Sequence, residues 1–376
     1  MTLLIIIVVA LIALVLYLYF YRKREKVTGY GPYIEALVAL LENDEDTAMK
    51  KFKEAVSLDS DLIDAYIRLG DLYRKRGDIS RAIQIHQSLT VRPTLKKQKE
   101  KRVYYALVND LLDANRHNKA IAFLKEILKI DKKDKHAREL VLRIYEEMSN
   151  YGDCITFYED GVFKPRVGKR HAFYYASFAN DKLKKVTEEN PDEEKEAINL
   201  LKKALRISAN SLTALYYLAN HFEQKGDLKK AKEYFYKIIK HHPDHAFLII
   251  PKFEKVYFEL DLFDEIIPIY EKIFRDNPKN FTVGFVLADL YEKKNDIETA
   301  KDLYYKLADV YPVSILPKLH LLKANTDDET LKEKIAKIEN IISHGKFKCT
   351  KCAFSTEKFS FLCPKCHAIE SFLSYL

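Results

Sequence analysis

Apolar and small residues recur at helical spacing through most of the chain, separated by charged positions and short turns. The pattern is plainest between Tyr66 and Ala82, where a Leu-Gly pair and a second tyrosine precede Gly77. Apolar residues three and four positions apart predict amphipathic helices, and a glycine between two such segments predicts a turn. The same order of residues returns at 215–243 and at 287–312, so the sequence predicts repeated helix pairs.

One small position sets the period of this pattern. It falls in the second helix of each pair, where a small residue lets the two helices approach and stack on the next pair. Its members are Ala48, Ala82, Ala120, Cys154, Ala197, Ala231, Ile266 and Ala300. The intervals between them are 34, 38, 34, 43, 34, 35 and 34 residues. The tetratricopeptide repeat has a period of about 34 residues, so the pattern matches that repeat.

This period predicts an all-α fold in which about eight tetratricopeptide repeats form a right-handed superhelical solenoid. The repeats are expected over 33–312, with insertions near 94–101 and 181–193 where the intervals lengthen. Apolar residues at helical spacing from 313 to 344 predict closing helices, which extends the expected solenoid domain to 33–344. Such a solenoid offers a long concave surface to extended peptides or helices.

The N-terminal residues differ from the rest because Leu3 to Tyr21 carry no charge. A helix of these nineteen residues reaches about 28 Å, which is close to the hydrocarbon thickness of a bilayer. We therefore expect a transmembrane helix at 1–21. A signal peptide is the alternative, but no basic segment precedes the apolar run and no A-x-A site follows it.

Aromatic and then basic residues follow one another at the end of this apolar run. Three tyrosines and a phenylalanine end it, and four lysines and arginines lie within 22–26. Aromatic rings favour the headgroup region, and basic residues stay on the cytoplasmic side of a membrane. The sequence thus predicts a single-pass protein whose body and C-terminus are cytoplasmic. Residues 22–32 are expected to form a basic juxtamembrane linker, with a hinge at Gly29–Pro32.

Four cysteines near the other end form two C-x-x-C pairs. They are Cys349 and Cys352, then Cys363 and Cys366 after ten intervening residues. Four thiolates at this spacing can surround one tetrahedral metal ion, usually zinc, at about 2.3 Å each. A segment this short cannot fold on apolar burial alone, and a bound metal supplies the missing free energy. Residues 345–376 are therefore predicted to be a small rubredoxin-like or zinc-ribbon module.

Three other interpretations of these cysteines are considered. Two disulfides would suit a secreted protein, but a cytoplasmic tail is kept reduced. Cys363 to His367 also match C-x-x-C-H, the c-type haem attachment motif, but haem would leave Cys349 and Cys352 without a role. Iron stays open, because a four-thiolate site accepts either metal. The fifth cysteine, Cys154, is expected to be a small core residue.

Charge and composition exclude some classes of function. The net charge is +8, but it is dispersed along the chain and does not argue for nucleic-acid binding. No nucleotide-binding, zinc-protease or serine-hydrolase motif occurs, and 10 glycines in 376 residues leave little room for phosphate-binding loops. The chain is predicted to be an adaptor without catalytic residues. His86 is expected to be a packed, hydrogen-bonded histidine rather than a ligand.

The order of anchor, repeats and four-cysteine tail resembles the lipopolysaccharide assembly protein B family (LapB, YciM) along essentially the whole chain. The specific stretches are Leu69–Leu89, Phe347–Phe354 and Cys363–Cys366. The family has the same ten-residue gap between cysteine pairs. Two positions depart from it: Ala353 stands where glycine is usual, and Ile369 where tryptophan is usual.

What the resemblance implies is a non-enzymatic regulator at the cytoplasmic face of the inner membrane. Its partners would be an FtsH-type membrane protease and an LpxC-type deacetylase, whose degradation balances lipopolysaccharide with phospholipid. The family's metal ligands carry over to the four cysteines named above, with one zinc ion. Two alternatives remain, an iron rubredoxin-like redox protein and an assembly factor for another membrane complex. Whether the protein forms a homo-oligomer is left open.

Overall fold

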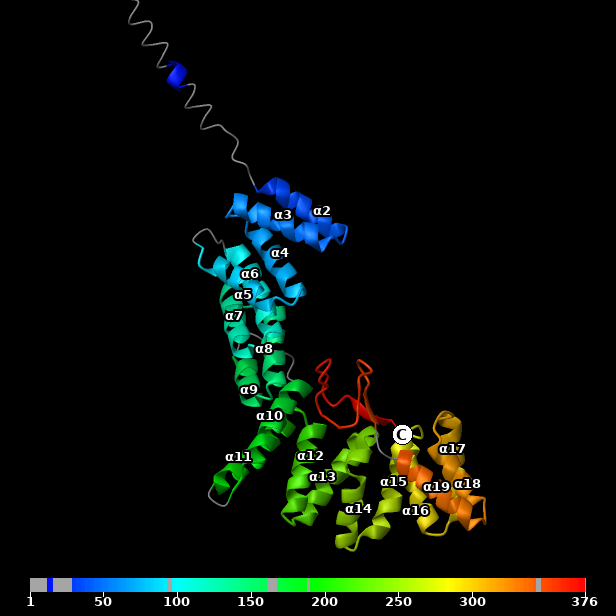
Figure 1. Cartoon of the computed structure of the whole chain (residues 1–376). Coiled ribbons are helices and arrows are strands. Elements are labelled where there is room, and N and C mark those ends of the chain that lie inside the picture. The colour runs from blue at the N-terminus through cyan, green and yellow to red at the C-terminus, as the bar shows by residue number, and fades with distance from the viewer. Residues whose placement is uncertain are drawn as a thin grey trace, which may run out of the picture. The chain divides into compact units, whose positions relative to one another are not determined.

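The chain forms two compact units in the computed structural model, residues 1–144 and 145–376. The structure describes residues 12–15, 29–92, 97–160, 168–187, 190–342 and 346–375. Figure 1 shows that each unit is built mostly of helices.

Helices make up most of the described residues. The first unit contains α2 (Tyr30–Leu41), α3 (Glu45–Leu58), α4 (Ile63–Lys75), α5 (Ile79–Thr90), α6 (Lys97–Asp113) and α7 (His117–Ile130), and α8 (Lys135–Glu147) runs into the second unit. The second unit continues with α9 (Tyr151–Glu159), α10 (Lys169–Leu183), α11 (Pro191–Ile207), α12 (Leu212–Gln224), α13 (Leu228–His241), η1 (Pro243–Leu248), α14 (Ile250–Glu259), η2 (Phe263–Glu265), α15 (Ile266–Asp276), α16 (Phe281–Lys293), α17 (Ile297–Val310), α18 (Leu316–Ala324) and α19 (Glu329–Ile342).

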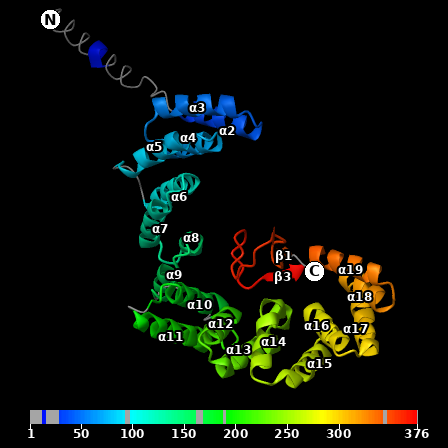
Figure 2. The ribbon, with the colours of Figure 1, turned by 60° about the horizontal axis from the view of Figure 1, so that its bottom comes forward.

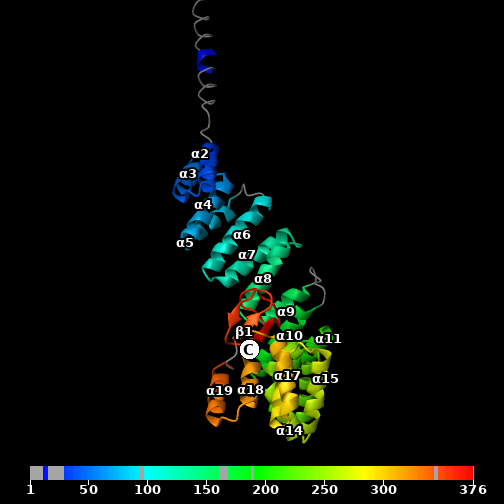
Figure 3. The same cartoon turned by 90° about the vertical axis from the view of Figure 1, so that its right-hand side faces the viewer.

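The predicted small position is buried in every repeat. Its eight members, from Ala48 in α3 to Ala300 in α17, are between 0 and 2% exposed. Each lies in the second helix of a pair, and the paired helices run side by side, as α6 and α7 do in Figure 3. The prediction of an all-α fold built from tetratricopeptide-type helix pairs is therefore confirmed. Where Ile266 replaces the alanine, the second helix starts late, after the short η2.

The turn between the two helices of a repeat follows a common design in seven of the described repeats. The backbone passes through a residue with φ between 53 and 82°, a left-handed conformation that glycine and asparagine tolerate best. These residues are Asn43, Gly77, Asn115, Ser149, Gly226, Asp261 and Asn295. In most repeats an Asp or Asn follows and caps the second helix; Asp78, for example, accepts a hydrogen bond from the Arg81 backbone N–H at 3.1 Å. The turns therefore stop one helix and start the next.

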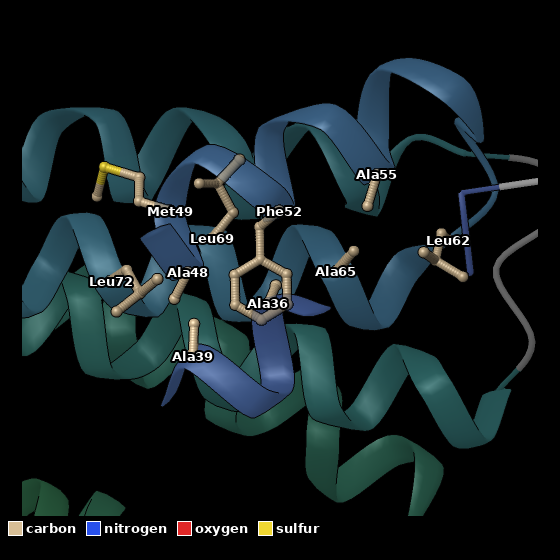
Figure 4. Close-up of a cluster of buried hydrophobic side chains, with 10 residues drawn as sticks. All are labelled: Ala36, Ala39, Ala48, Met49, Phe52, Ala55, Leu62, Ala65, Leu69 and Leu72. Carbon is tan, nitrogen blue, oxygen red and sulfur yellow. The ribbon is translucent and has the colours of Figure 1, made fainter. Parts of the chain in front are cut away.

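The core of the first repeat shows how these pairs pack. Figure 4 shows Phe52 of α3, which is 0% exposed, among small residues of α2 and α4. Ala36 and Ala39 let α2 approach closely, and Ala65 and Leu69 close the other side. The alternation of small and large side chains fills the space between three helices, as expected for close-packed repeats.

The N-terminal boundary of the repeats differs from the predicted one. The linker was expected to run to residue 32, but α2 begins at Tyr30, so the hinge expected at Gly29–Pro32 is wrong. Pro32 lies in the first turn of the helix, where a missing backbone N–H is no loss. The predicted transmembrane helix at 1–21 lies outside the described residues, except for the helical residues 12–15. Within the described ranges, every helix is too short or too polar to traverse a lipid bilayer.

The C-terminal module is the only part of the described chain with a β-sheet. Its strands are β1 (Lys346–Cys349), β2 (Ser355–Thr356) and β3 (Phe372–Tyr375), in the order β2-β1-β3. Both pairings are antiparallel, and Cys349 lies opposite Phe372. In Figure 2 the module lies on the inner side of the curve formed by α10–α19 of the same unit. The helices α18 and α19 agree with the closing helices predicted for 313–344.

Candidate metal centre

The two C-x-x-C segments adopt the same backbone path. In the first, the Ala353 N–H donates to the Cys349 carbonyl and the Cys349 N–H to the Phe354 carbonyl, both at 2.9 Å. In the second, the His367 N–H donates to the Cys363 carbonyl and the Cys363 N–H to the Ala368 carbonyl, again at 2.9 Å. Each segment is thus a tight knuckle that turns both of its sulfur atoms to one side.

The knuckles bring all four predicted sulfurs together. Every Sγ atom lies within 4.8 Å of the other three. Cys349 to Cys366 and Cys352 to Cys363 are both 3.7 Å apart. Four sulfurs at about 2.3 Å from a central zinc would be about 3.8 Å apart in a regular tetrahedron, so the spacing fits a metal ion. All four cysteines are free thiols in the structure, which argues against the disulfide interpretation.

The protonation of the thiols also suits a cation. Burial raises the pKa of Cys366, and hydrogen bonding with the three other sulfurs adds to this, so that the pKa reaches about 12. Burial also acts on Cys349, but the Ser371 hydroxyl and backbone N–H groups outweigh it and lower the pKa to about 6. Thiolates that lie close together repel one another, so the thiols are harder to deprotonate. A metal ion at their centre offsets this repulsion and favours the thiolate form. These four residues could therefore hold one metal ion.

Both knuckles carry a conformational cost. Ala353 follows the second cysteine of its pair with φ of 58°, and His367 occupies the equivalent position with φ of 56°. A side chain in this left-handed region costs about 1–2 kcal/mol compared with a right-handed conformation, a cost that glycine avoids. The structure thus explains why glycine is expected at position 353 and shows that alanine adopts the same turn.

A buried carboxylate fastens the module to the start of α12. Glu370 is 5% exposed, and its Oε1 accepts hydrogen bonds from the Thr213 backbone N–H and hydroxyl, both at 2.8 Å. Its Oε2 lies 3.1 Å from Lys169 Nζ. The first N–H groups of a helix lack partners within the helix, and the helix dipole favours a negative charge there. Glu370 therefore caps α12 from the module.

A second buried carboxylate fastens the module to the end of α8. Glu146 is 3% exposed, and its Oε2 lies 2.7 Å from His367 Nδ1. Its Oε1 accepts hydrogen bonds from Arg170 at 2.9 Å and from the Tyr174 hydroxyl at 2.6 Å. Burial raises the pKa of Glu146, but these three partners outweigh burial and lower the pKa below its usual value. The carboxylate therefore stays ionised in the interface.

Aromatic rings fill the space between the two carboxylate contacts. Phe361 of the module packs edge-on against Tyr216 and Tyr217 of α12, with ring centroids 5.3 and 5.7 Å apart. Phe247 of η1 contacts Phe347 and Phe359 at 5.6 and 5.9 Å. These contacts bury apolar surface around the polar ones. The module is thus an integral part of the second unit.

Comparisons with known proteins show what this chain is similar to. The tetratricopeptide repeat family model matches residues 213–245 and 283–314. Lipopolysaccharide assembly protein B of Escherichia coli (strain K12) is 24% identical over 349 residues, which is 89% of this chain and 87% of that protein. The protein of the same name from Haemophilus influenzae is 23% identical and covers 90% of this chain and 88% of its own length.

The chain is similar to lipopolysaccharide assembly protein B along most of its length. The predicted resemblance to this family is thereby confirmed. Among solved structures, a crystal structure of MamA is 19% identical, with a TM-score of 0.33, and covers 48% of this chain and 92% of that one. The tetratricopeptide protein YrrB is 18% identical, with a TM-score of 0.33, and covers 50% of this chain and 89% of that one. The family-model match is to a tetratricopeptide repeat, a scaffold whose stacked helices offer binding surfaces, in agreement with a non-enzymatic chain.

Sequence reasoning missed the residues that join the module to the repeats. Glu146 and Glu370 have polar neighbours in the sequence, and Arg170 lies in a basic stretch. This context predicts that all three are exposed on the surface. Ile369, at the position where the resembling family has tryptophan, forms an isolated bridge with Leu362 instead. The one signal in the sequence was His367, which was noted for the haem motif and in fact contacts Glu146.

The other predicted residues behave as expected. His86 is 0% exposed, with Nδ1 2.6 Å from Asp110 Oδ2 and Nε2 3.0 Å from the Ile67 carbonyl, so it is a packed histidine with both nitrogens bonded. Gly70 makes room for it, since a Cβ there would lie 2.3 Å from the His86 ring. Cys154 is buried at 0% exposure, and burial raises its pKa well above the usual range, so it is an inert core thiol.

Proposed function

We propose that this protein is a membrane-tethered cytoplasmic adaptor that regulates lipopolysaccharide synthesis. In this proposal it works with an FtsH-type membrane protease to control the turnover of an LpxC-type deacetylase. The observation that carries the proposal is the similarity to lipopolysaccharide assembly protein B over 89% of this chain and 87% of that protein. The docked four-cysteine module and the buried repeat positions are compatible with the same protein class.

The tether is part of the mechanism. A single membrane helix at 1–21 would confine the repeats to the neighbourhood of a membrane protease, which raises their effective concentration for each other. The helix pairs would bind the client through their exposed faces, as stacked repeats do. No step of this work requires a catalytic residue in the adaptor.

We infer that the metal is one zinc ion, held by Cys349, Cys352, Cys363 and Cys366. Zinc bound by four thiolates is structural and has no redox chemistry. Its part would be to hold the two knuckles together, while Glu146 and Glu370 connect them to the helices. Metal analysis and a visible spectrum of the purified protein test this, because zinc is colourless. A coloured, reducible iron centre would favour the rubredoxin-like alternative.

The test of the adaptor function is crosslinking in membranes of the native bacterium, followed by purification of the full-length chain. We expect a membrane protease and a deacetylase among the crosslinked proteins, and a longer half-life of the deacetylase when the adaptor gene is deleted. Complementation with Cys349→Ser/Cys352→Ser should fail to restore turnover, whereas Lys351→Ala should restore it. An unchanged half-life in the deletion strain would refute the proposal, and a different crosslinked complex would favour an assembly factor.

A further inference from the structure

The first helix of the repeats exposes an apolar face. Tyr30, Ile34, Val38 and Leu41 of α2 are 56, 58, 47 and 83% exposed. They are separated by four, four and three positions, which places them on one side of an α-helix. A row of large apolar side chains on one surface helix marks a contact site rather than scattered exposure.

The opposite face of α2 is already buried. Ala36 and Ala39 are 0 and 4% exposed, and Leu37 and Leu40 pack against the same core. Glu35 is the one charged side chain within α2, and it lies 2.6 Å from Lys51 of α3, which also pairs with Glu54 at 3.2 Å. A helix with apolar side chains on opposite faces is most stable when both of those faces are covered. The outer face of α2 therefore needs a second apolar surface.

The chain leading into α2 indicates which surface that is. Gly29 is buried against α3, and a Cβ there would lie 2.4 Å from the Ala55 carbonyl. The residue that precedes α2 is therefore held in place on α3. The apolar run ends at Tyr21, and the residues from there to Gly29 can span at most about 29 Å. Arg22, Lys23, Arg24 and Lys26 lie in that interval. Basic residues beside a membrane segment bind anionic headgroups, at about 1 kcal/mol each.

We propose that the face formed by Tyr30, Ile34, Val38 and Leu41 lies in the interfacial region of an anionic lipid bilayer. This inference rests on the proposed function, because the membrane helix at 1–21 brings α2 to the bilayer. Amphipathic helices at such interfaces bury their apolar face about 5–10 Å into the headgroup region. The first repeat is then seated on the membrane surface, and the repeats that follow start from a fixed orientation.

The absence of tryptophan in this chain allows a direct test, because one introduced tryptophan is the only source of its fluorescence. The full-length Leu41→Trp variant is reconstituted in phosphatidylcholine and phosphatidylglycerol vesicles, with and without brominated acyl chains. We expect blue-shifted emission and loss of intensity in brominated lipid. The matched control is Phe258→Trp, which replaces a 70% exposed residue of the second unit and should emit as in water, without quenching.

A third variant separates this inference from the proposed function. Leu11→Trp reports on the apolar segment itself and should be quenched strongly by brominated lipid. If Leu11→Trp is quenched and Leu41→Trp is not, the tether stands and the seating of α2 is refuted. A blue shift of Leu41→Trp that grows with protein density, without quenching by bromine, would show a second copy on this face and would also refute the inference. If Leu11→Trp is not quenched, the tether itself fails.

Discussion

In the first repeat, ten buried apolar residues from three helices form the core, whereas the core of the C-terminal module consists of Cys349, Cys363 and Phe372. Each repeat also stacks on its neighbours, so no single side chain carries the fold. The module is not part of the stack and, apart from the aromatic contacts of Phe347, Phe359 and Phe361, it depends on four sulfurs and two buried carboxylates. Substitutions of a few polar atoms should therefore affect the module far more than comparable changes affect a repeat.

The largest effect is expected from removing two sulfurs. Cys349→Ser/Cys352→Ser should abolish metal binding and unfold β1–β3, because a structural zinc site contributes about 10–16 kcal/mol of binding free energy. The helix pairs of the first unit should remain protected from hydrogen exchange. Metal content and hydrogen exchange of the purified protein measure both results.

The control for this change is Lys351→Ala, which alters an exposed side chain between the same two cysteines. It should retain metal and leave the module folded. If β1–β3 stay protected from exchange in the double variant, the module folds without a metal ion and does not depend on its four sulfurs.

The next effect is expected at the contact with α8. Glu146→Gln removes a buried carboxylate that pairs with Arg170 and contacts His367, and we expect it to destabilise the second unit by about 3–5 kcal/mol, the usual cost of breaking a buried ion pair. Denaturant unfolding of the second unit measures the loss. Glu147→Gln is the matched control, since Glu147 is 48% exposed on its side chain and its removal should cost no more than about 0.5 kcal/mol. Equal effects of the two substitutions would show that the carboxylate contact does not fasten the module.

A smaller effect, with a defined pH dependence, is expected at His86. Burial lowers the pKa of His86, but the hydrogen bond and charge of Asp110 outweigh burial and raise the pKa above the usual 6.5. Burial also raises the pKa of Asp110, so the charged pair stabilises the first unit from above the Asp110 pKa up to about pH 6.5. This contribution is lost as the pH rises through the raised His86 pKa. We expect the free energy of unfolding to fall by about 1–3 kcal/mol across that range.

The matched variant is Asp110→Asn, which removes the carboxylate but keeps a side chain of similar size. It should lower the His86 pKa and flatten the pH dependence of unfolding in the first unit, as measured by hydrogen exchange of α5 and α6. A pH dependence that survives in Asp110→Asn would assign it to other groups.

The smallest effect is expected from Ala353→Gly. Because Ala353 has φ of 58°, glycine should relieve left-handed strain and stabilise the module by about 1 kcal/mol. Thermal unfolding of the metal-bound protein measures the gain. Ala353→Ser is the control and should give none, and destabilisation by glycine would show that the knuckle is not strained.

The repeats were predictable because their cores are local. Ala82 and Ala231 belong to a series spaced mostly 34 or 35 residues apart, and Asp78 and Asp227 cap the same turn in their repeats, so period and turn chemistry agree. The cysteine cluster was predictable for the same reason, since each knuckle is set by a few adjacent residues. The start of α2 was not predicted correctly because glycine and proline at Gly29–Pro32 are typical of a hinge outside a helix. The first turn of a helix nevertheless accepts proline.

The docking of the module could not be predicted in this way. Glutamate is almost always exposed unless it is paired, so Glu146 and Glu370 gave no sign of burial. Their partners are remote in the sequence: His367 lies 221 positions from Glu146, and Thr213 lies 157 positions from Glu370. No periodicity links such positions, and only the folded chain brings them together.

These two contacts join residues that are distant in the sequence, and they affect how the second unit unfolds. In a linear stack each repeat contacts only its neighbours, so unfolding can begin at one end and proceed repeat by repeat. Glu146 and His367 join the beginning of this stack to its C-terminal module and close it into a ring. Closing a long loop costs only a little more conformational entropy than closing a short one, so the length of chain between these two residues does not prevent the contact. The helices between α8 and the module should then lose structure cooperatively, in a single transition.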